Sequence, residues 1–434
     1  MKDNIYYKRR VEFFTHLKNN SVALLHSNEF QTRSNDTEFS YRQNSNFYYL
    51  SGIIEDESII VFKKSKNRVK TYLFVKEVTK EESLWVGKRM GVRGASKKYT
   101  FDKIYNIDSF EKKIEKILKN STHLYYDLFL ESKINTHLKL TCKSLISKRA
   151  LFKSPTNFLD INQIIHKMRL VKDKEEISLI KKAISITKEA HHRAMLTCKP
   201  EKYEYEIAAE MEYIFAKHGA SHNAYESIVA GANRANTLHY IDNNKLLKDN
   251  TLVLIDAGCE YKMYASDITR TFPINGRFTQ PQKELYEMVL DVQEKIIKMV
   301  RAGITKNRLQ KASEKLLTKG MIDLGILKGS VKKLIKEKKH KRYYPHGIGH
   351  WMGIDVHDPL PYVDKELKPL TFKEGMILTI EPGIYIDKND KSVPKRYRGI
   401  AIRIEDDILV KKDGYENLSK DIIKSVDEIE KLMQ

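Results

Sequence analysis

The stretch LIDAGCEYKMYASDITRTFPINGRFT, residues 254–279, decides how the fold is interpreted. It contains two β-rich runs around a polar turn, a pattern that predicts an antiparallel hairpin. With Tyr261 and Lys262 as a two-residue loop, Asp256 would lie directly opposite Asp267, with Cβ atoms about 4.5–5.5 Å apart. Two carboxylates facing each other on an otherwise apolar hairpin repel unless they hold a cation or share a proton. The hairpin therefore predicts an acidic functional site.

A second segment, HGIGHWMGIDVHD (residues 346–358), carries a cluster of histidines. It holds His346, His350 and His357, in a chain with 14 histidines in all. The interspersed glycines argue against a helix and favour a loop. One isolated histidine is usually a hydrogen-bonded structural residue. Three within a dozen positions indicate that at least one is a metal ligand or an acid–base group.

Two later segments each place a glutamate in an apolar, β-rich run. EGMILTIEPGIYI (residues 374–386) puts Glu381 at the end of a predicted strand, and YRGIAIRIEDDIL (residues 397–409) puts Glu405 inside another. Arg403 precedes Glu405 by two residues and so shares its face of the strand. Taken alone, each glutamate would face solvent or pair with a nearby arginine. Neither strand has a polar face that explains them.

Together these residues form one candidate ligand set, consisting of Asp256, Asp267, His350, Glu381 and Glu405. Two divalent cations would balance the charge of the four carboxylates. Oxygen-rich ligation favours Mn²⁺, with Zn²⁺, Co²⁺ and Fe²⁺ as alternatives. Paired metal ions lower the pKa of a bound water toward neutrality. The set therefore predicts a dinuclear hydrolytic site.

Composition limits the function classes. The 434 residues are 41% hydrophobic, enough for a core, and carry a formal net charge of +21. The lysines are spread along the chain, and the densest run, residues 328–342, is interrupted by apolar residues, so we expect a solvated surface rather than a nucleic-acid site.

Three distant cysteines without a CxxC pair indicate a reducing compartment. Without a signal-peptide run or a span of about 20 apolar residues, we expect a cytoplasmic protein without a membrane segment.

The chain changes character near residue 168. Residues 1–168 alternate short strands and helices, which is typical of an α/β domain. A long amphipathic helix is predicted from about Lys174, where apolar residues recur at steps of three and four. Residues 169–434 then mix helices and strands without a regular βαβ repeat, which favours an α+β domain.

The four quoted segments resemble the pita-bread metallopeptidases, and within that family the aminopeptidase P (Xaa-Pro aminopeptidase) branch. They occur in the family's order and at its approximate separations. NDTEFSYRQNSNFYYLSGI (residues 35–53) and LWVGKRMG (residues 84–91) are similar to the family's N-terminal domain. The resemblance implies an α/β N-terminal non-catalytic domain, followed by an α+β pita-bread (creatinase/aminopeptidase-like) catalytic domain.

The resemblance also implies roles for single residues. Asp267 and Glu405 match ligands that bridge two metal ions, Asp256 serves one ion, and His350 and Glu381 mainly serve the other. Glu381 also matches the proton acceptor. The remaining matches are substrate-facing His239, His357 at the tetrahedral intermediate, His346 in the proline pocket, Arg403 behind the residues that contact metal or substrate, Tyr385 in the substrate pocket, and Trp85 and Asp36 from the N-terminal domain.

The function expected on this basis is metal-dependent removal of the N-terminal residue from peptides with proline in second position. A homo-oligomer, either a dimer or a tetramer, is expected as well. One alternative is a prolidase, which cleaves only Xaa-Pro dipeptides with the same ligands. Another is a non-catalytic pita-bread binding module, but such a module would be expected to have lost ligands.

Overall fold

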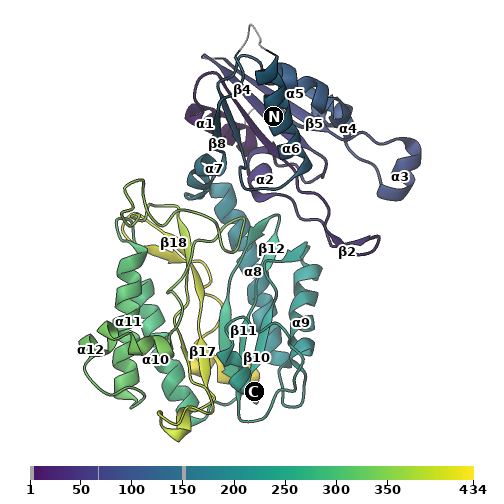
Figure 1. Cartoon of the computed structure of the whole chain (residues 1–434). Coiled ribbons are helices and arrows are strands. Elements are labelled where there is room, and N and C mark those ends of the chain that lie inside the picture. Colours follow the sequence, from purple (N-terminus) through teal and green to yellow (C-terminus); the bar gives the residue numbers. More distant parts are fainter. Residues whose placement is uncertain (1–3, 67, 149–152) are drawn as a thin grey trace. The chain divides into compact units, whose positions relative to one another are not determined.

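The computed structural model describes residues 4–66, 68–148 and 153–434. The chain divides into two compact units, Met1–Met168 and Arg169–Gln434, drawn in purple to blue and in teal to yellow in Figure 1. Within the described residues, no helix has the length and apolar character needed to cross a membrane.

A six-stranded mixed sheet forms the centre of the first unit, with strand order β6-β5-β4-β1-β7-β8. Strand β1 pairs antiparallel with β4 and parallel with β7. The sheet strands are β1 (Ser21–His26), β4 (Ile59–Ser65), β5 (Arg68–Val75), β6 (Lys103–Asn106), β7 (His123–Tyr126) and β8 (Asn157–Asp160). A separate small hairpin consists of β2 (Thr32–Ser34) and β3 (Thr37–Glu38).

Helices cover both faces of this sheet. The helices of this unit are α1 (Ile5–His16), α2 (Ser45–Ser51), α3 (Lys80–Val86), α4 (Gly91–Lys98), α5 (Phe110–Leu118), α6 (Lys133–Ser147) and α7 (Asn162–Arg169). On one face, Ile114 of α5 and Leu138 of α6 join a buried cluster with Val61 of β4. On the other, Phe13 of α1 contacts Phe62, with ring centroids 5.2 Å apart. This layered arrangement confirms the α/β class expected for the N-terminal part.

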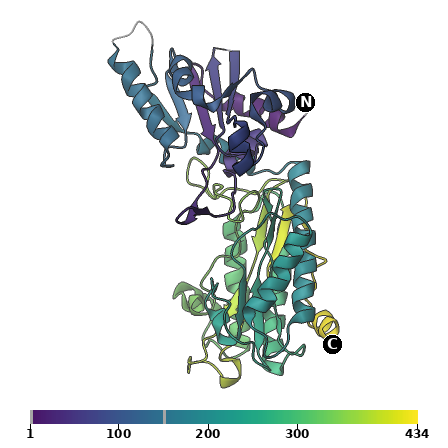
Figure 2. The same ribbon diagram turned by 90° about the vertical axis from the view of Figure 1, so that its right-hand side faces the viewer.

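The long helices of the second unit run alongside its strands, as Figures 1 and 2 show for α8 and α9. The helices are α8 (Lys174–Thr197), α9 (Glu204–Lys217), α10 (Gln280–Ile297), α11 (Lys306–Asp323), α12 (Val331–Lys336) and α13 (Val426–Met433). Helix α8 begins where the sequence indicated. The Asp173 carboxylate accepts hydrogen bonds from the amides of Glu175 and Glu176, which satisfies free donors of the first turn.

Short strands form several small sheets in the second unit. The strands are β9 (His222–Asn223), β10 (Ile228–Gly231), β11 (Leu252–Asp256), β12 (Cys259–Tyr261), β13 (Tyr264–Ala265), β14 (Thr269–Pro273), β15 (Ile377–Ile380), β16 (Gly383–Tyr385), β17 (Ala401–Arg403), β18 (Asp406–Val410) and β19 (Tyr415–Asn417). They pair as β10-β11-β14, β13-β12-β9, β15-β18-β19 and β16-β17. The α+β class expected for this part is confirmed.

The hairpin of residues 254–279 forms, but the predicted register is wrong by two residues. Asp256 pairs with Thr269, not with Asp267. The turn residues are Lys262 and Met263, with φ values of 49° and 72°, as the tight right-twisting hairpin turns require. Because side chains alternate between faces, a shift of two residues leaves Asp267 on the same side as Asp256.

The first of the two later strands ends directly before Glu381, as expected, whereas the second is broken at Glu405. Strand β15 ends at Ile380, directly before Glu381. Strand β17 ends at Arg403 and β18 begins at Asp406, so Glu405 lies between the two strands. The ladders β15–β18 and β16–β17 share one register, in which Glu381 would lie opposite Glu405. The prediction that Glu405 lies inside a strand is therefore wrong. Both glutamates lie where one sheet gives way to the next.

Candidate metal centre

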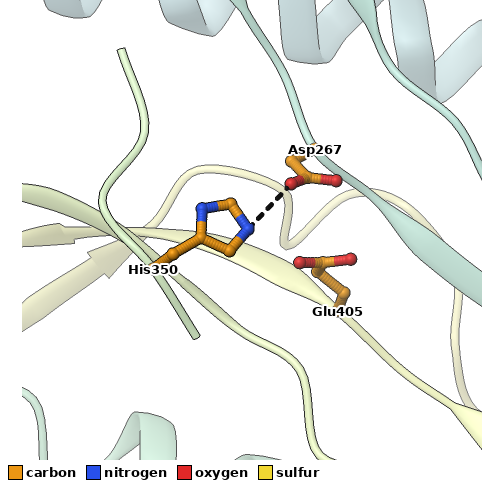
Figure 3. A group of neighbouring side chains, drawn as sticks. All are labelled: Asp267, His350 and Glu405. Atoms are coloured by element: carbon orange, nitrogen blue, oxygen red, sulfur yellow. Dashed lines mark ion pairs between the residues drawn. The ribbon is translucent and has the colours of Figure 1, made fainter. Parts of the chain in front are cut away.

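Three side chains from separate segments converge in the second unit. Asp267 lies just before β14, His350 lies in the glycine-rich loop, and Glu405 lies at the break between β17 and β18 (Figure 3). One ligand atom from each lies within 4.8 Å of the others. His350 Nε2 is 3.2 Å from Asp267 Oδ2. At this spacing the three side chains can bind the same cation.

The other two predicted ligands lie beside these three. Glu381 Oε1 is 3.7 Å from His350 Nε2. The hydroxyl of Tyr225 is 2.6 Å from Asp256 Oδ1 and 2.6 Å from Asp267 Oδ1. All five predicted ligands line one cavity of about 280 Å³.

The electrostatics of this cluster fit bound divalent cations. Burial and the neighbouring carboxylates raise the pKa of Glu381 to about 7 and that of Glu405 well above its usual range. Burial, together with Asp267, also raises the pKa of Asp256. Four carboxylates gathered in one cavity can all stay ionised only beside compensating positive charge. Carboxylate oxygens with one imidazole nitrogen are a donor set suited to Mn²⁺, Zn²⁺, Co²⁺ or Fe²⁺.

The position of His350 is set by the edge of β15. The amide of Thr379 donates to the His350 carbonyl, and the amide of Glu381 donates to the Ile348 carbonyl, both at 2.9 Å. A Cβ atom at Gly349 would lie 1.8 Å from the Thr379 carbonyl oxygen, so only glycine fits there. The His350 Nδ1 lies 3.1 Å from the Trp351 carbonyl oxygen. That contact leaves Nε2 directed at the carboxylates.

A chain of hydrogen bonds connects the cluster to His346. Arg403 Nη2 donates to Asp256 Oδ2 at 2.6 Å, and Nη1 donates to the Tyr385 hydroxyl at 2.9 Å. His346 Nδ1 lies 2.8 Å from the Gly347 carbonyl, which can only accept, so Nδ1 carries the proton. The Tyr385 hydroxyl, 2.9 Å away, therefore donates to Nε2. Burial lowers the pKa of His346 to about 4, which keeps this ring neutral.

The remaining predicted histidines line the mouth of the same cavity. His239 and His357 are exposed and line it, together with Arg403. The rings of His350 and His357 are perpendicular, with centroids 4.2 Å apart. The apolar part of the wall consists of Ile228, Leu238, Ile241 and Val356. A peptide entering the cavity would meet both imidazole groups and apolar side chains.

Two predicted residues belong to the first unit. Trp85 lies in α3 with 89% of its side chain exposed, and Asp36 lies in the turn between β2 and β3. Their roles stay predictions.

Sequence reasoning missed two residues of the site. Tyr225 bridges Asp256 and Asp267, as described above. Thr269 donates from Oγ1 to Glu405 Oε2 at 2.7 Å and accepts from Arg403 Nε at 3.1 Å. Tyr225 lies about 30 residues before Asp256 in sequence and reaches the site because β10 pairs with β11. No local pattern signals this, whereas the corrected pairing of Asp256 with Thr269 would have pointed to Thr269.

Comparison with known proteins follows the same division of the chain. The model of "Metallopeptidase family M24" matches residues 178–412. The chain belongs to metallopeptidase family M24. The model "Aminopeptidase P, N-terminal domain" matches residues 6–125. The pita-bread catalytic fold expected from the sequence is thereby confirmed.

Two bacterial relatives of this M24 chain match over almost their full length. It is 39% identical over 429 residues to a Xaa-Pro aminopeptidase of Haemophilus influenzae, covering 98% of this chain and 96% of the relative. It is 38% identical over 435 residues to one of Escherichia coli, covering 99% and 97%. A solved structure of proline aminopeptidase P II from Yersinia pestis superposes with a TM-score of 0.96 at 36% identity, covering 100% of this chain and 99% of that chain.

Proposed function

We propose that this chain is a Xaa-Pro aminopeptidase, a metal-dependent hydrolase that removes the N-terminal residue from peptides with proline in second position. The observation that carries the proposal is the convergence of Asp267, His350 and Glu405 in a cavity also lined by Asp256 and Glu381. Near full-length similarity to Xaa-Pro aminopeptidases supports it.

In this proposal, Asp256, Asp267, His350, Glu381 and Glu405 hold two divalent cations. When bound, such cations lower the pKa of water and polarise a carbonyl group. Asp267 and Glu405, which match the bridging ligands of the family, would hold the ions together with His350, and one ligand atom of each of the three lies within 4.8 Å of the others. Mn²⁺ is the metal we propose.

The proposed chemistry assigns proton transfers to two residues. Glu381 takes a proton from the attacking water, a role suited to a carboxylate that lines the cavity beside His350. His357, at the cavity mouth beside His350, donates a hydrogen bond to the oxygen of the tetrahedral intermediate. The leaving imino nitrogen needs a proton, because an amide nitrogen leaves poorly as an anion, and Glu381 returns it.

Selection of proline is proposed to rest on the other residues of the cavity. Proline has no N–H and a fixed ring, so a pocket can recognise it by shape. Neutral His346, held by Tyr385 and Arg403, forms one wall of that pocket, and His239 faces the substrate. We also propose that the chain forms a dimer or tetramer, in which Trp85 and Asp36 contact the substrate, and that it is cytoplasmic.

The test is cleavage of paired substrates, Xaa-Pro and Xaa-Pro-Yaa-Zaa, by metal-stripped protein resupplied with Mn²⁺. Release of the first residue from the longer peptide, with loss of the activity in Asp267→Asn, is the expected result. Cleavage restricted to the dipeptide would identify a prolidase instead. Cleavage of neither peptide with any divalent metal would leave the binding-module alternative.

A further inference from the structure

Gln293 of α10 lies behind the two strand breaks that carry Glu381 and Glu405. Its side chain is fully buried. Its Nε2 lies 3.3 Å from the carbonyl oxygen of Ile380 and 3.2 Å from that of Ile404. These two residues immediately precede Glu381 and Glu405. One side chain therefore bonds the backbones of both ligand-bearing segments.

The orientation of this amide is fixed by its partners. Gln293 Oε1 accepts a hydrogen bond from Lys424 Nζ at 2.8 Å. An ammonium group can only donate and a carbonyl can only accept, so the amide cannot be reversed. Lys424 Nζ is itself 2.6 Å from Asp406 Oδ2. Both N–H groups of the amide are consequently aimed at the two backbone carbonyls.

The side-chain amide of Gln293 makes these hydrogen bonds at the point where strand pairing is interrupted. The β15–β18 ladder ends with Ile380 opposite Asp406, and the β16–β17 ladder begins with Gly383 opposite Arg403. No named strand holds Glu381 or Glu405 between these pairs. A buried hydrogen bond to both carbonyls limits how far the two segments can move apart.

We propose that Gln293 is a positioning residue, which sets the separation of Glu381 and Glu405 and so the affinity of the centre for its metal ions. This proposal rests on the proposed function, because it takes both glutamates as metal ligands. Groups that orient metal ligands typically change metal affinity about 10- to 100-fold when they are replaced.

Two substitutions separate hydrogen bonding from packing. Gln293→Glu keeps the shape of the side chain and an oxygen for Lys424, but it loses the N–H donors to Ile380 and Ile404. Gln293→Leu loses the donors and the acceptor together. We expect either variant to bind Mn²⁺ about tenfold more weakly than the parent chain, measured by calorimetric titration of the metal-stripped protein.

Gln282 offers a matched control on the same helix. It is 5% exposed, and its Nε2 donates to the Asn250 carbonyl at 3.0 Å, away from the ligands. We expect Gln282→Leu to lower the thermal unfolding midpoint but to leave the Mn²⁺ dissociation constant unchanged.

The result that overturns the proposal is parental Mn²⁺ affinity in Gln293→Glu, or an equal loss of affinity in Gln282→Leu. Absence of Mn²⁺ binding by the parent chain would overturn it as well. Because the titration needs no peptide, it is independent of cleavage. Failure to cleave Xaa-Pro peptides, combined with weakened Mn²⁺ binding in Gln293→Glu, would reject the proposed substrate and keep the role of Gln293.

Discussion

The hydroxyl of Tyr225, a residue outside the predicted set, contacts two of the candidate ligands. It reaches Asp256 and Asp267 at 2.6 Å each. We expect Tyr225→Phe to weaken Mn²⁺ binding about tenfold, because both carboxylates lose the group that orients them. Tyr397→Phe is the control, since that buried tyrosine donates to Glu284 instead. Equal Mn²⁺ affinity in both variants would contradict the expectation. At this scale the sequence could predict candidate metal ligands but not the neutral groups that contact them.

The burial of His191 in α8 leads us to predict that the stability of the fold depends on pH. It is fully buried, with Nε2 3.2 Å from the Ala257 carbonyl oxygen, and burial lowers its pKa to about 3. The unfolded chain takes up this proton near the ordinary value of about 6.5. The contribution of neutral His191 to the free energy of unfolding is therefore fully present above pH 6.5 and is lost as the pH falls toward 3.

We expect His191→Gln to make the free energy of unfolding depend less strongly on pH. The amide keeps a donor for Ala257 but does not titrate. Urea unfolding of metal-free protein from pH 6.5 to pH 4 should show a slope smaller by up to one proton, about 1.4 kcal/mol per pH unit. Parallel curves for His191→Gln and the parent chain would show that His191 is not the titrating group.

At the scale of elements, the site depends on the close contact of the glycine-rich loop with β15. A Cβ atom at Gly349 would meet the Thr379 carbonyl oxygen at 1.8 Å, whereas one at Gly347 would have no neighbour closer than 3.8 Å. We expect Gly349→Ala to lower the free energy of unfolding by about 3 kcal/mol or more and to abolish tight Mn²⁺ binding. Gly347→Ala should do neither. Urea unfolding and Mn²⁺ titration of both variants measure this, and equal behaviour of the two would contradict it.

Elements were predictable where apolar periodicity alone determines them. Helix α8 begins at Lys174, as expected from its amphipathic pattern. The apolar run around Glu405 is continuous in sequence, so it predicted a single strand. The structure breaks it because this carboxylate turns toward a site shared by several segments, which a local pattern does not record. The hairpin register failed for a related reason: its turn lacks the glycine that would have marked the central residues.

At the scale of the whole molecule, the division into two compact units predicts two unfolding events. The proposed ligands all belong to the second unit, Arg169–Gln434. A metal ion that binds only the folded state stabilises it by about 2.7 kcal/mol per site at 100 times its dissociation constant. Calorimetry should therefore show two transitions. Mn²⁺ should raise the midpoint temperature of one of them, and a chelator should lower the midpoint temperature of the same transition. Equal shifts of both transitions would contradict this expectation.

The strand breaks at Glu381 and Glu405 also bear on how the site opens. The amide of Glu381 donates to Ile348 and that of Glu405 donates to Thr269, so each is protected by an element other than its own ladder. In amide hydrogen exchange, these two positions would report detachment of the histidine loop and of β14, respectively. Ligation across the break would link the two detachments. The two amides would then exchange through one cooperative opening with metal bound and independently without it.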